Sequence, residues 1–136
     1  MCIRDRVLYL VDVYRARIQH WRTVEKLGFE ITDVTVKSGM KQFGPDWDAL
    51  RTYKDSKKTV DDIAIFEMLY LEKMNLLWRV APEEFDKLVR QKTLVLSCYC
   101  DQENAVYCHV ETLLKCVEKV CKGKKIPFNY KGIIKK

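Results

Sequence analysis

The stretch Thr93-Leu94-Val95-Leu96-Ser97-Cys98 decides the fold of this chain. Apolar side chains occupy both of its alternating faces, which is typical of a strand that is covered by helices on both sides. We therefore predict a central strand over residues 93–98. Together with the elements around it, this strand predicts a three-layer α/β/α domain with a mostly parallel, Rossmann-like sheet.

The other elements follow from the spacing of the apolar residues. Apolar, β-branched runs predict strands over residues 7–13, 31–36 and 126–134. Helical spacing predicts helices over residues 14–28, 45–53, 59–77, 82–89 and 105–123. Thr59 and Asp62 form a variant of the capping box at the start of the third helix, and Gly123 is expected to end the last one.

Length and composition predict a single domain over residues 7–136. The chain has 136 residues, of which 48% are hydrophobic, and this is enough for one buried core. It has no run of roughly 18 apolar residues, so we expect no contact with a membrane. Six cysteines without a secretory signal predict reduced thiols in the cytoplasm. The first six residues resemble the translated read-through of a sequencing adapter and are excluded from the functional reasoning.

Two short motifs bring thiols and an imidazole to the end of the predicted central strand. Cys98 and Cys100 flank a tyrosine there, and Cys108 and His109 follow at the start of the last helix. Ligands of α/β domains bind outside the carboxyl ends of the strands, so we expect these four residues to line a pocket and to be the candidate catalytic residues. A helix start lowers the pKa of a thiol, which would make Cys108 a nucleophile with His109 as acid or base.

The same four residues match a Cys₃His zinc set by count. Their spacing is not that of the two-residue-gapped zinc knuckles, so the sequence leaves open whether a metal is bound. Buried packing is the simplest alternative for any cysteine, because free cysteine is among the most buried residue types. Cys116 and Cys121 lie further along the last helix, and we interpret both as packing residues.

Basic residues close to strand and helix ends predict an anion site. Lys37 and Ser38 end the second strand, and Tyr53 and Lys54 end the helix that follows Pro45. These four are the candidate ligand-binding residues, suited to a phosphate or carboxylate. The formal net charge is +6, or +5 without the first six residues, and it also favours anionic partners, either a nucleotide-like small molecule or nucleic acid. Glycine-rich dinucleotide, phosphate-loop and serine-hydrolase motifs are absent from the sequence.

Several of these segments resemble the domain-of-unknown-function 488 family (DUF488). The segments that carry the resemblance are 33–39, 43–47 with Tyr53 and Lys54, 94–100 with Cys108 and His109, and 130–134. The resemblance implies an α/β fold with a pocket beside the Cys-Tyr-Cys loop, and it implies no settled reaction. Two positions depart from the family pattern, because Val110 replaces an arginine and Ile133 replaces an acid.

A second hypothesis is a non-catalytic module that binds nucleic acid or protein. In that interpretation the basic C-terminal tail makes the contacts and the cysteines only pack. The sequence does not decide whether the chain is an enzyme, and it names no substrate or oligomeric state.

Overall fold

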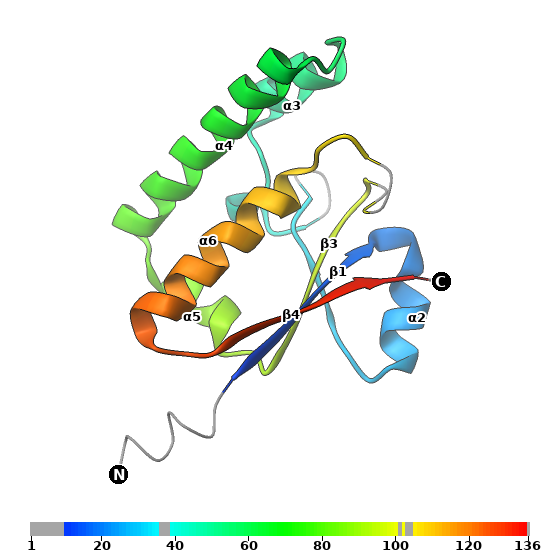
Figure 1. The fold of residues 1–136 in the computed structure, drawn as a ribbon, viewed down its shortest axis with the longest axis vertical. Helices are drawn as coiled ribbons and strands as arrows, with labels where there is room; N and C mark the ends of the chain where they lie inside the picture. The colour runs from blue at the N-terminus through cyan, green and yellow to red at the C-terminus, as the bar shows by residue number, and fades with distance from the viewer. Residues whose placement is uncertain (1–9, 36–38, 101, 103–104, 136) are drawn as a thin grey trace.

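The computed structural model describes residues 10–35, 39–100, 102 and 105–135 (Figure 1). In this part of the chain four strands form one sheet: β1 (Val11–Arg17), β2 (Ile31–Asp33), β3 (Thr93–Cys98) and β4 (Phe128–Ile134). Their order is β2-β3-β1-β4, and every neighbouring pair is parallel. The predicted α/β fold with a parallel sheet is confirmed, and β3 has the central position and the bounds expected of it.

Strand β1 runs further than its sequence pattern indicates. Residues 14–17 were expected to begin a helix, and this prediction is wrong because they pair with β3 on one side, and Tyr14 to Ala16 also pair with β4 on the other. Pairing on both sides keeps the backbone extended despite the helical spacing of the side chains. The helical segments η1 (Ile18–His20) and α2 (Trp21–Lys26) follow only after Arg17. Residues 7–9 of the predicted strand lie outside the described residues.

Strand β2 is shorter than expected. It ends at Asp33, although a strand was predicted to residue 36, which lies outside the described residues. The side chain of Asp33 accepts a hydrogen bond from the backbone N–H of Thr35 at 2.9 Å, and its carbonyl accepts one from Met40 at 2.7 Å. These bonds turn the chain away from the sheet.

The remaining helical segments connect β2 to β3 and β3 to β4. They are η2 (Lys41–Phe43), α3 (Trp47–Lys54), α4 (Val60–Val80), α5 (Glu83–Val89) and α6 (His109–Lys124). The capping box at Thr59 is confirmed, with reciprocal bonds of 3.2 and 3.0 Å to Asp62. Gly123 does not end α6 as predicted. The helix continues to Lys124, and Lys125 takes the left-handed conformation that closes it.

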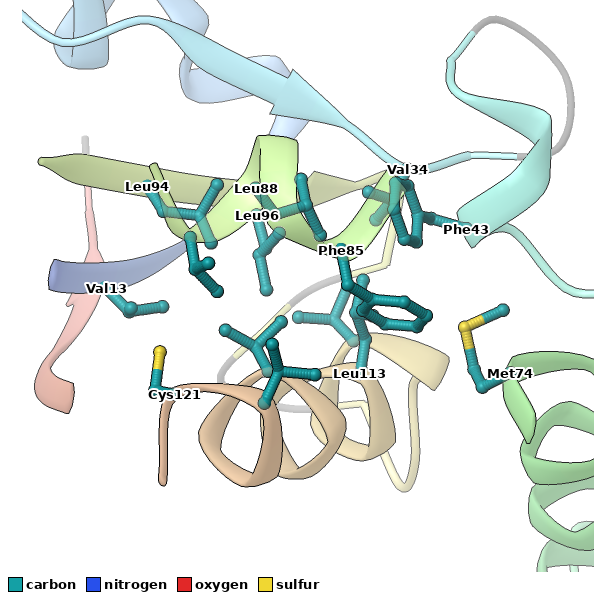
Figure 2. Close-up of a cluster of buried hydrophobic side chains, with 14 of the residues drawn as sticks. Val13, Val34, Phe43, Met74, Phe85, Leu88, Leu94, Leu96, Leu113 and Cys121 are labelled. Carbon is teal, nitrogen blue, oxygen red and sulfur yellow. The ribbon is translucent and has the colours of Figure 1, made fainter. Parts of the chain in front are cut away.

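Helices cover both faces of the sheet, so the domain has three layers (Figure 1). On one face, α2 contributes Val24, which packs with Ala16 and Val95. The other face holds the larger core, formed with α5, α6 and part of α4 (Figure 2). Its buried side chains include Val13, Leu94, Leu96, Met74, Phe85, Leu113 and Cys121. Burying each large apolar side chain contributes roughly 1.5–3 kcal/mol, so this core holds α6 against β3.

Among the described residues, no helix combines the length and the apolar character needed to cross a membrane.

Candidate functional site

The four candidate catalytic residues meet at the carboxyl edge of the sheet. Cys98 is the last residue of β3, and Cys100 follows two residues later. Cys108 is the N-cap of α6, and His109 is the first residue of that helix. Because α6 packs on the face of β3 that carries Leu94 and Leu96, the beginning of the helix lies beside the end of the strand. The two motifs therefore converge in space, although they come from different elements.

Short distances join the thiols and the imidazole. The Sγ atoms of Cys98 and Cys100 are 4.0 Å apart, and Cys108 Sγ lies 3.8 Å from His109 Nδ1. The ligand atoms of Cys98, Cys108 and His109 all lie within 4.8 Å of one another. These three residues are buried, whereas Cys100 is half-buried. All of these thiols are free, and none forms a disulfide.

A backbone carbonyl fixes the orientation of His109. Its Nε2 donates to the carbonyl oxygen of Val34, just beyond β2, at 2.9 Å. The neutral imidazole therefore carries its proton on Nε2 and presents the lone pair of Nδ1 to Cys108. Burial lowers the pKa of His109 below its usual value, which favours this neutral form. Within a regular helix the side chains of adjacent residues point about 100° apart. Cys108 precedes the first helical residue and has an extended backbone, so its side chain still lies beside that of His109.

The three thiols differ in acidity because they share hydrogen bonds. Hydrogen bonds to the sulfur of Cys100 hold its pKa well below the usual range of a thiol. The bond from Cys108 has the largest effect, and the bond from Cys98 the second largest. The positive charge of Lys54 acts in the same direction. As the donors, Cys98 and Cys108 have raised pKa values. The expectation that the helix start lowers the pKa of Cys108 is therefore wrong, because donation to Cys100 and burial outweigh the helix dipole.

Three polar residues hold Cys108 in place. The side-chain amide of Gln102 donates to the Cys100 carbonyl at 3.1 Å and lies 3.7 Å from Cys108 Sγ. Arg15 in β1 donates twice to the Oε1 atom of Gln102, at 3.1 and 2.9 Å. Glu111 accepts from the backbone N–H of Cys108 at 3.3 Å, and its carboxylate lies 4.0 Å from the Arg15 guanidinium. A connected polar network of this kind restricts where the thiol can move.

The thiol cluster forms one end of a cavity of about 670 Å³. All four cluster residues line it, together with residues of α3, α4 and the segment before α6. Aromatic side chains make up much of its wall. The rings of Tyr53 and Phe66 are stacked with centroids 4.6 Å apart, and Tyr107 packs edge-on to Phe66 at 5.8 Å. Trp47 also lines the cavity and is half exposed, and the Arg51 guanidinium lies over its ring at 5.9 Å.

Two lysines lie at the same cavity. Lys54 and Lys58 line it and are both exposed. The ammonium group of Lys58 lies 5.7 Å from the centre of the Tyr53 ring, a cation–π distance. Lys54 forms no ion pair with any described residue. A positive charge is thus available at the cavity.

The candidate ligand-binding residues divide into two pairs. Tyr53 and Lys54 line the same cavity as the cysteines, at the end of α3. Lys37 and Ser38 lie outside the described residues. Val110, for which the resemblance to the 488 family implies an arginine, is a residue of α6 that is fully buried in the core. An uncharged side chain suits that position.

Several residues of the site were not singled out from the sequence. Arg15 carried a signal, because it follows the core residues Val11 and Val13 at alternate positions of β1 and therefore lies on their face of the sheet. Gln102 carried none, because it is one polar residue in a polar loop. Phe66 was assigned to the apolar face of its helix, and nothing in its spacing distinguishes a core residue from one that lines a cavity.

Comparison of the chain with protein-family models, with curated proteins and with solved structures gives no match. Chemically, the cluster offers a thiolate nucleophile beside a neutral imidazole, or a set of soft ligands for a metal ion.

Proposed function

We propose that the protein binds a small anionic ligand with a planar ring, a nucleotide or a compound like it, in the cavity beside Cys100. One observation carries the proposal: a single cavity combines an aromatic wall, a lysine that forms no ion pair with any described residue and a cluster of cysteines and a histidine. Its volume of about 670 Å³ lies within the roughly 300–1,000 Å³ range of small-molecule pockets.

The anionic part of the ligand follows from the lysines. Lys54 is the last residue of α3 and Lys58 lies in the connection to α4, and both line the cavity. A phosphate placed between them gains charge-assisted hydrogen bonds without displacing an existing ion pair of Lys54. Lys37 and Ser38 remain predicted members of this anion site.

The planar part of the ligand follows from the aromatic residues. Tyr53, Phe66 and Tyr107 already pack against one another, so they form a rigid apolar wall. Trp47, at the start of α3, is 51% exposed, and a ligand ring would stack on the face of its indole opposite Arg51. Stacking on aromatic side chains contributes about 1–3 kcal/mol per nucleobase and tolerates any base.

The reactive part of the ligand would lie over Cys100. This thiol is the most exposed of the cluster, and its lowered pKa supplies a thiolate near neutral pH. Thiol chemistry on the bound compound is therefore the reaction class that we favour, with His109 as acid or base. Free thiols also favour a reducing compartment, so we place the protein in the cytoplasm. The resemblance to the 488 family stays a prediction.

Calorimetric titration with AMP, adenosine and inorganic phosphate tests the proposal. AMP should bind more tightly than either fragment, and Lys54→Gln should weaken AMP binding about tenfold, the loss of one charge-assisted bond. Lys57→Gln is the matched control, because Lys57 lies in the same connection but does not line the cavity. Quenching of the Trp47 fluorescence should accompany binding and vanish in Trp47→Phe. If neither AMP nor the other nucleoside monophosphates bind, the proposal is wrong.

The alternative, a basic nucleic-acid module, has weaker support. It assigns the cysteines to packing, yet Cys98 and Cys108 point their sulfur atoms at other titratable groups. In the basic tail, Lys124 is already paired with Asp86 at 2.6 Å. Salt separates the two functions, because binding through many phosphate contacts weakens steeply with ionic strength. A single-stranded oligonucleotide that binds more tightly than AMP at low salt and dissociates at about 0.2 M salt would favour the alternative.

A further inference from the structure

Three ligand atoms of the thiol cluster, those of Cys98, Cys108 and His109, lie close enough together to surround one metal ion, and Cys100 Sγ lies 4.0 Å from Cys98 Sγ. Tetrahedral zinc with Zn–S bonds of about 2.3 Å and a Zn–N bond of about 2.0 Å separates its ligand atoms by roughly 3.5–3.8 Å. The two measured separations, Cys98 to Cys100 and Cys108 to His109, are 4.0 and 3.8 Å. The largest distance within the Cys98, Cys108 and His109 set is at most 4.8 Å. Rotation of the side chains would bring these three atoms to the separations of a zinc site, and Cys100 would supply the fourth ligand by turning toward the ion.

The contacts around the cluster are those of a metal site. His109 is anchored through Nε2 to the Val34 carbonyl at 2.9 Å, which leaves Nδ1 as the coordinating atom. Histidines that bind metals almost always donate their other nitrogen in this way. The Gln102 amide, 3.7 Å from Cys108 Sγ, supplies an N–H group to a thiolate. These contacts orient the ligands independently of the cavity.

Packing alone does not account for the cluster. Cys121 shows what a packing cysteine looks like here, because it is fully buried among apolar side chains of the core (Figure 2). Cys98 and Cys108 belong to the same core, but their sulfur atoms also lie within hydrogen-bond distance of Cys100 Sγ and His109 Nδ1, respectively. A disulfide is not formed either, since a bonded pair of sulfur atoms is about 2.05 Å apart.

From this geometry we propose that Cys98, Cys100, Cys108 and His109 bind one Zn²⁺ ion. Soft thiolates and imidazole select zinc over the hard cations Mg²⁺ and Ca²⁺. On binding, each thiol that is protonated releases its proton to solvent, and His109 coordinates as the neutral imidazole. The ion joins the end of β3 to the start of α6, and its Cys100 side faces the cavity. The inference rests on the cluster and not on the ligand proposed above. In the zinc-bound protein Cys100 and His109 are metal ligands, so the thiol chemistry proposed above belongs to the metal-free protein.

The test is metal binding by the reduced, full-length chain. Elemental analysis of the protein purified under reducing conditions should give about one zinc per chain. Titration of the metal-free protein with Co²⁺ should give the sulfur-to-cobalt charge-transfer and visible bands of a tetrahedral thiolate site at one equivalent, and Zn²⁺ should displace the cobalt. Cobalt spectra without thiolate bands, or zinc binding at less than half an equivalent, would overturn the proposal.

Variants and thiol labelling locate the site. Cys108→Ser should weaken Co²⁺ binding by roughly 100-fold or more, and Gln102→Ala by about tenfold, as expected for a supporting residue. Cys116→Ser is the matched control, because this half-buried cysteine of α6 lies outside the cluster. If Cys108→Ser does not fold, labelling of the wild-type protein still decides the matter. Zinc should protect Cys98, Cys100 and Cys108 from alkylation and leave Cys116 unaffected, whereas equal protection or none would refute the site.

The two proposals fail in different ways. AMP titrations of the metal-free and the zinc-loaded protein report on the cavity, and cobalt spectra report on the thiols. Zinc binding without AMP binding would leave the metal site standing and refute the ligand. AMP binding without zinc binding would support the ligand and refute the metal site.

Discussion

Arg15 and Gln102 are joined by two hydrogen bonds although they lie 87 residues apart in the chain. The Nε and Nη2 atoms of the guanidinium both donate to the same amide oxygen, at 3.1 and 2.9 Å. The amide nitrogen of Gln102 then reaches Cys108 Sγ at 3.7 Å. This chain of contacts connects the central strand β1 to the thiol cluster.

Removing the Arg15 guanidinium should therefore lower stability. We expect Arg15→Gln to reduce the free energy of unfolding by about 1–3 kcal/mol, because the Gln102 oxygen loses two charge-assisted bonds in a partly buried place. Arg79→Gln makes the same chemical change on the exposed surface of α4 and should cost no more than about 0.5 kcal/mol. Urea denaturation measures both values. Equal effects for the two variants would contradict a role for the Arg15 network.

The capping box at the start of α4 gives a second prediction. The Thr59 hydroxyl accepts from the backbone N–H of Asp62 at 3.2 Å, so one unsatisfied donor of the helix end is paired. Thr59→Ala should lower the free energy of unfolding by about 1 kcal/mol. Thr59→Ser keeps the oxygen and should stay within a few tenths of a kcal/mol of the wild type. Urea or thermal unfolding of the two variants distinguishes the hydroxyl from the methyl group, and an equal loss in both would exclude capping.

The reciprocal bond of the capping box predicts a pH dependence. The Thr59 backbone N–H donates to the Asp62 carboxylate at 3.0 Å, and this bond, with that from the Thr59 hydroxyl, holds the pKa of Asp62 below its usual 3.8. A folded-state pKa below the unfolded value means that the stabilisation is present above about pH 4. It is lost as the pH falls through the folded-state pKa. The difference in Tm between wild type and Asp62→Ala should therefore be constant from pH 7 to about pH 5 and shrink below about pH 4. A difference that grows on acidification would have the wrong sign.

Replacing two glycines by alanine should change the free energy of unfolding in opposite directions. Gly132 has a φ of 109° at the irregularity where β4 pairs with β1, a conformation that other residues rarely adopt. Gly123 lies within α6, and a Cβ atom there would meet nothing within 4 Å. Gly132→Ala should destabilise the protein by about 1–3 kcal/mol, whereas Gly123→Ala should stabilise it by about 0.5–1 kcal/mol. Thermal unfolding of both variants checks the signs. A stabilising Gly132→Ala would show that the strand relaxes to a regular register.

The sequence predicted the fold where local signals and tertiary contacts agree. Strand β3 has the predicted bounds, because residues apolar on both faces have no stable place except a central strand. The capping box at Thr59 predicted where α4 begins, because both hydrogen bonds are local. The prediction failed at Tyr14, where the side-chain spacing was helical and sheet pairing on both sides kept the chain extended. It also failed at Gly123, because α6 extends one residue beyond it.

The same distinction between local signals and tertiary contacts applies to the candidate site. That Cys98 and Cys108 would lie at the carboxyl edge of the sheet follows from topology, and the structure places them there. Which thiol is the most acidic depends on hydrogen bonds among side chains that converge only in the folded chain, so the sequence pointed to Cys108 rather than Cys100. The bond from His109 to Val34 joins residues 75 apart, and no spacing rule predicts it.

The hydroxyl groups of two buried tyrosines, one of them beside the cavity, predict different effects of a change to phenylalanine. The Tyr70 hydroxyl donates to the Phe43 carbonyl at 2.6 Å in the core, whereas the Tyr53 hydroxyl is buried beside the cavity without a partner among the described residues. Tyr70→Phe should therefore cost about 1–2 kcal/mol, because it leaves a buried carbonyl unpaired. Tyr53→Phe removes an unpaired hydroxyl, so the free energy of unfolding should stay unchanged or rise by up to about 1 kcal/mol.

The same tyrosine variants then test what the Tyr53 hydroxyl is for. If it serves a ligand, Tyr53→Phe should weaken AMP binding about three- to tenfold while the protein keeps its stability, and Tyr70→Phe should leave AMP binding unchanged. Urea denaturation and calorimetric titration of the two proteins give the four values. A Tyr53→Phe protein that is less stable than wild type and binds AMP equally well would mean that the hydroxyl supports the fold and not the site.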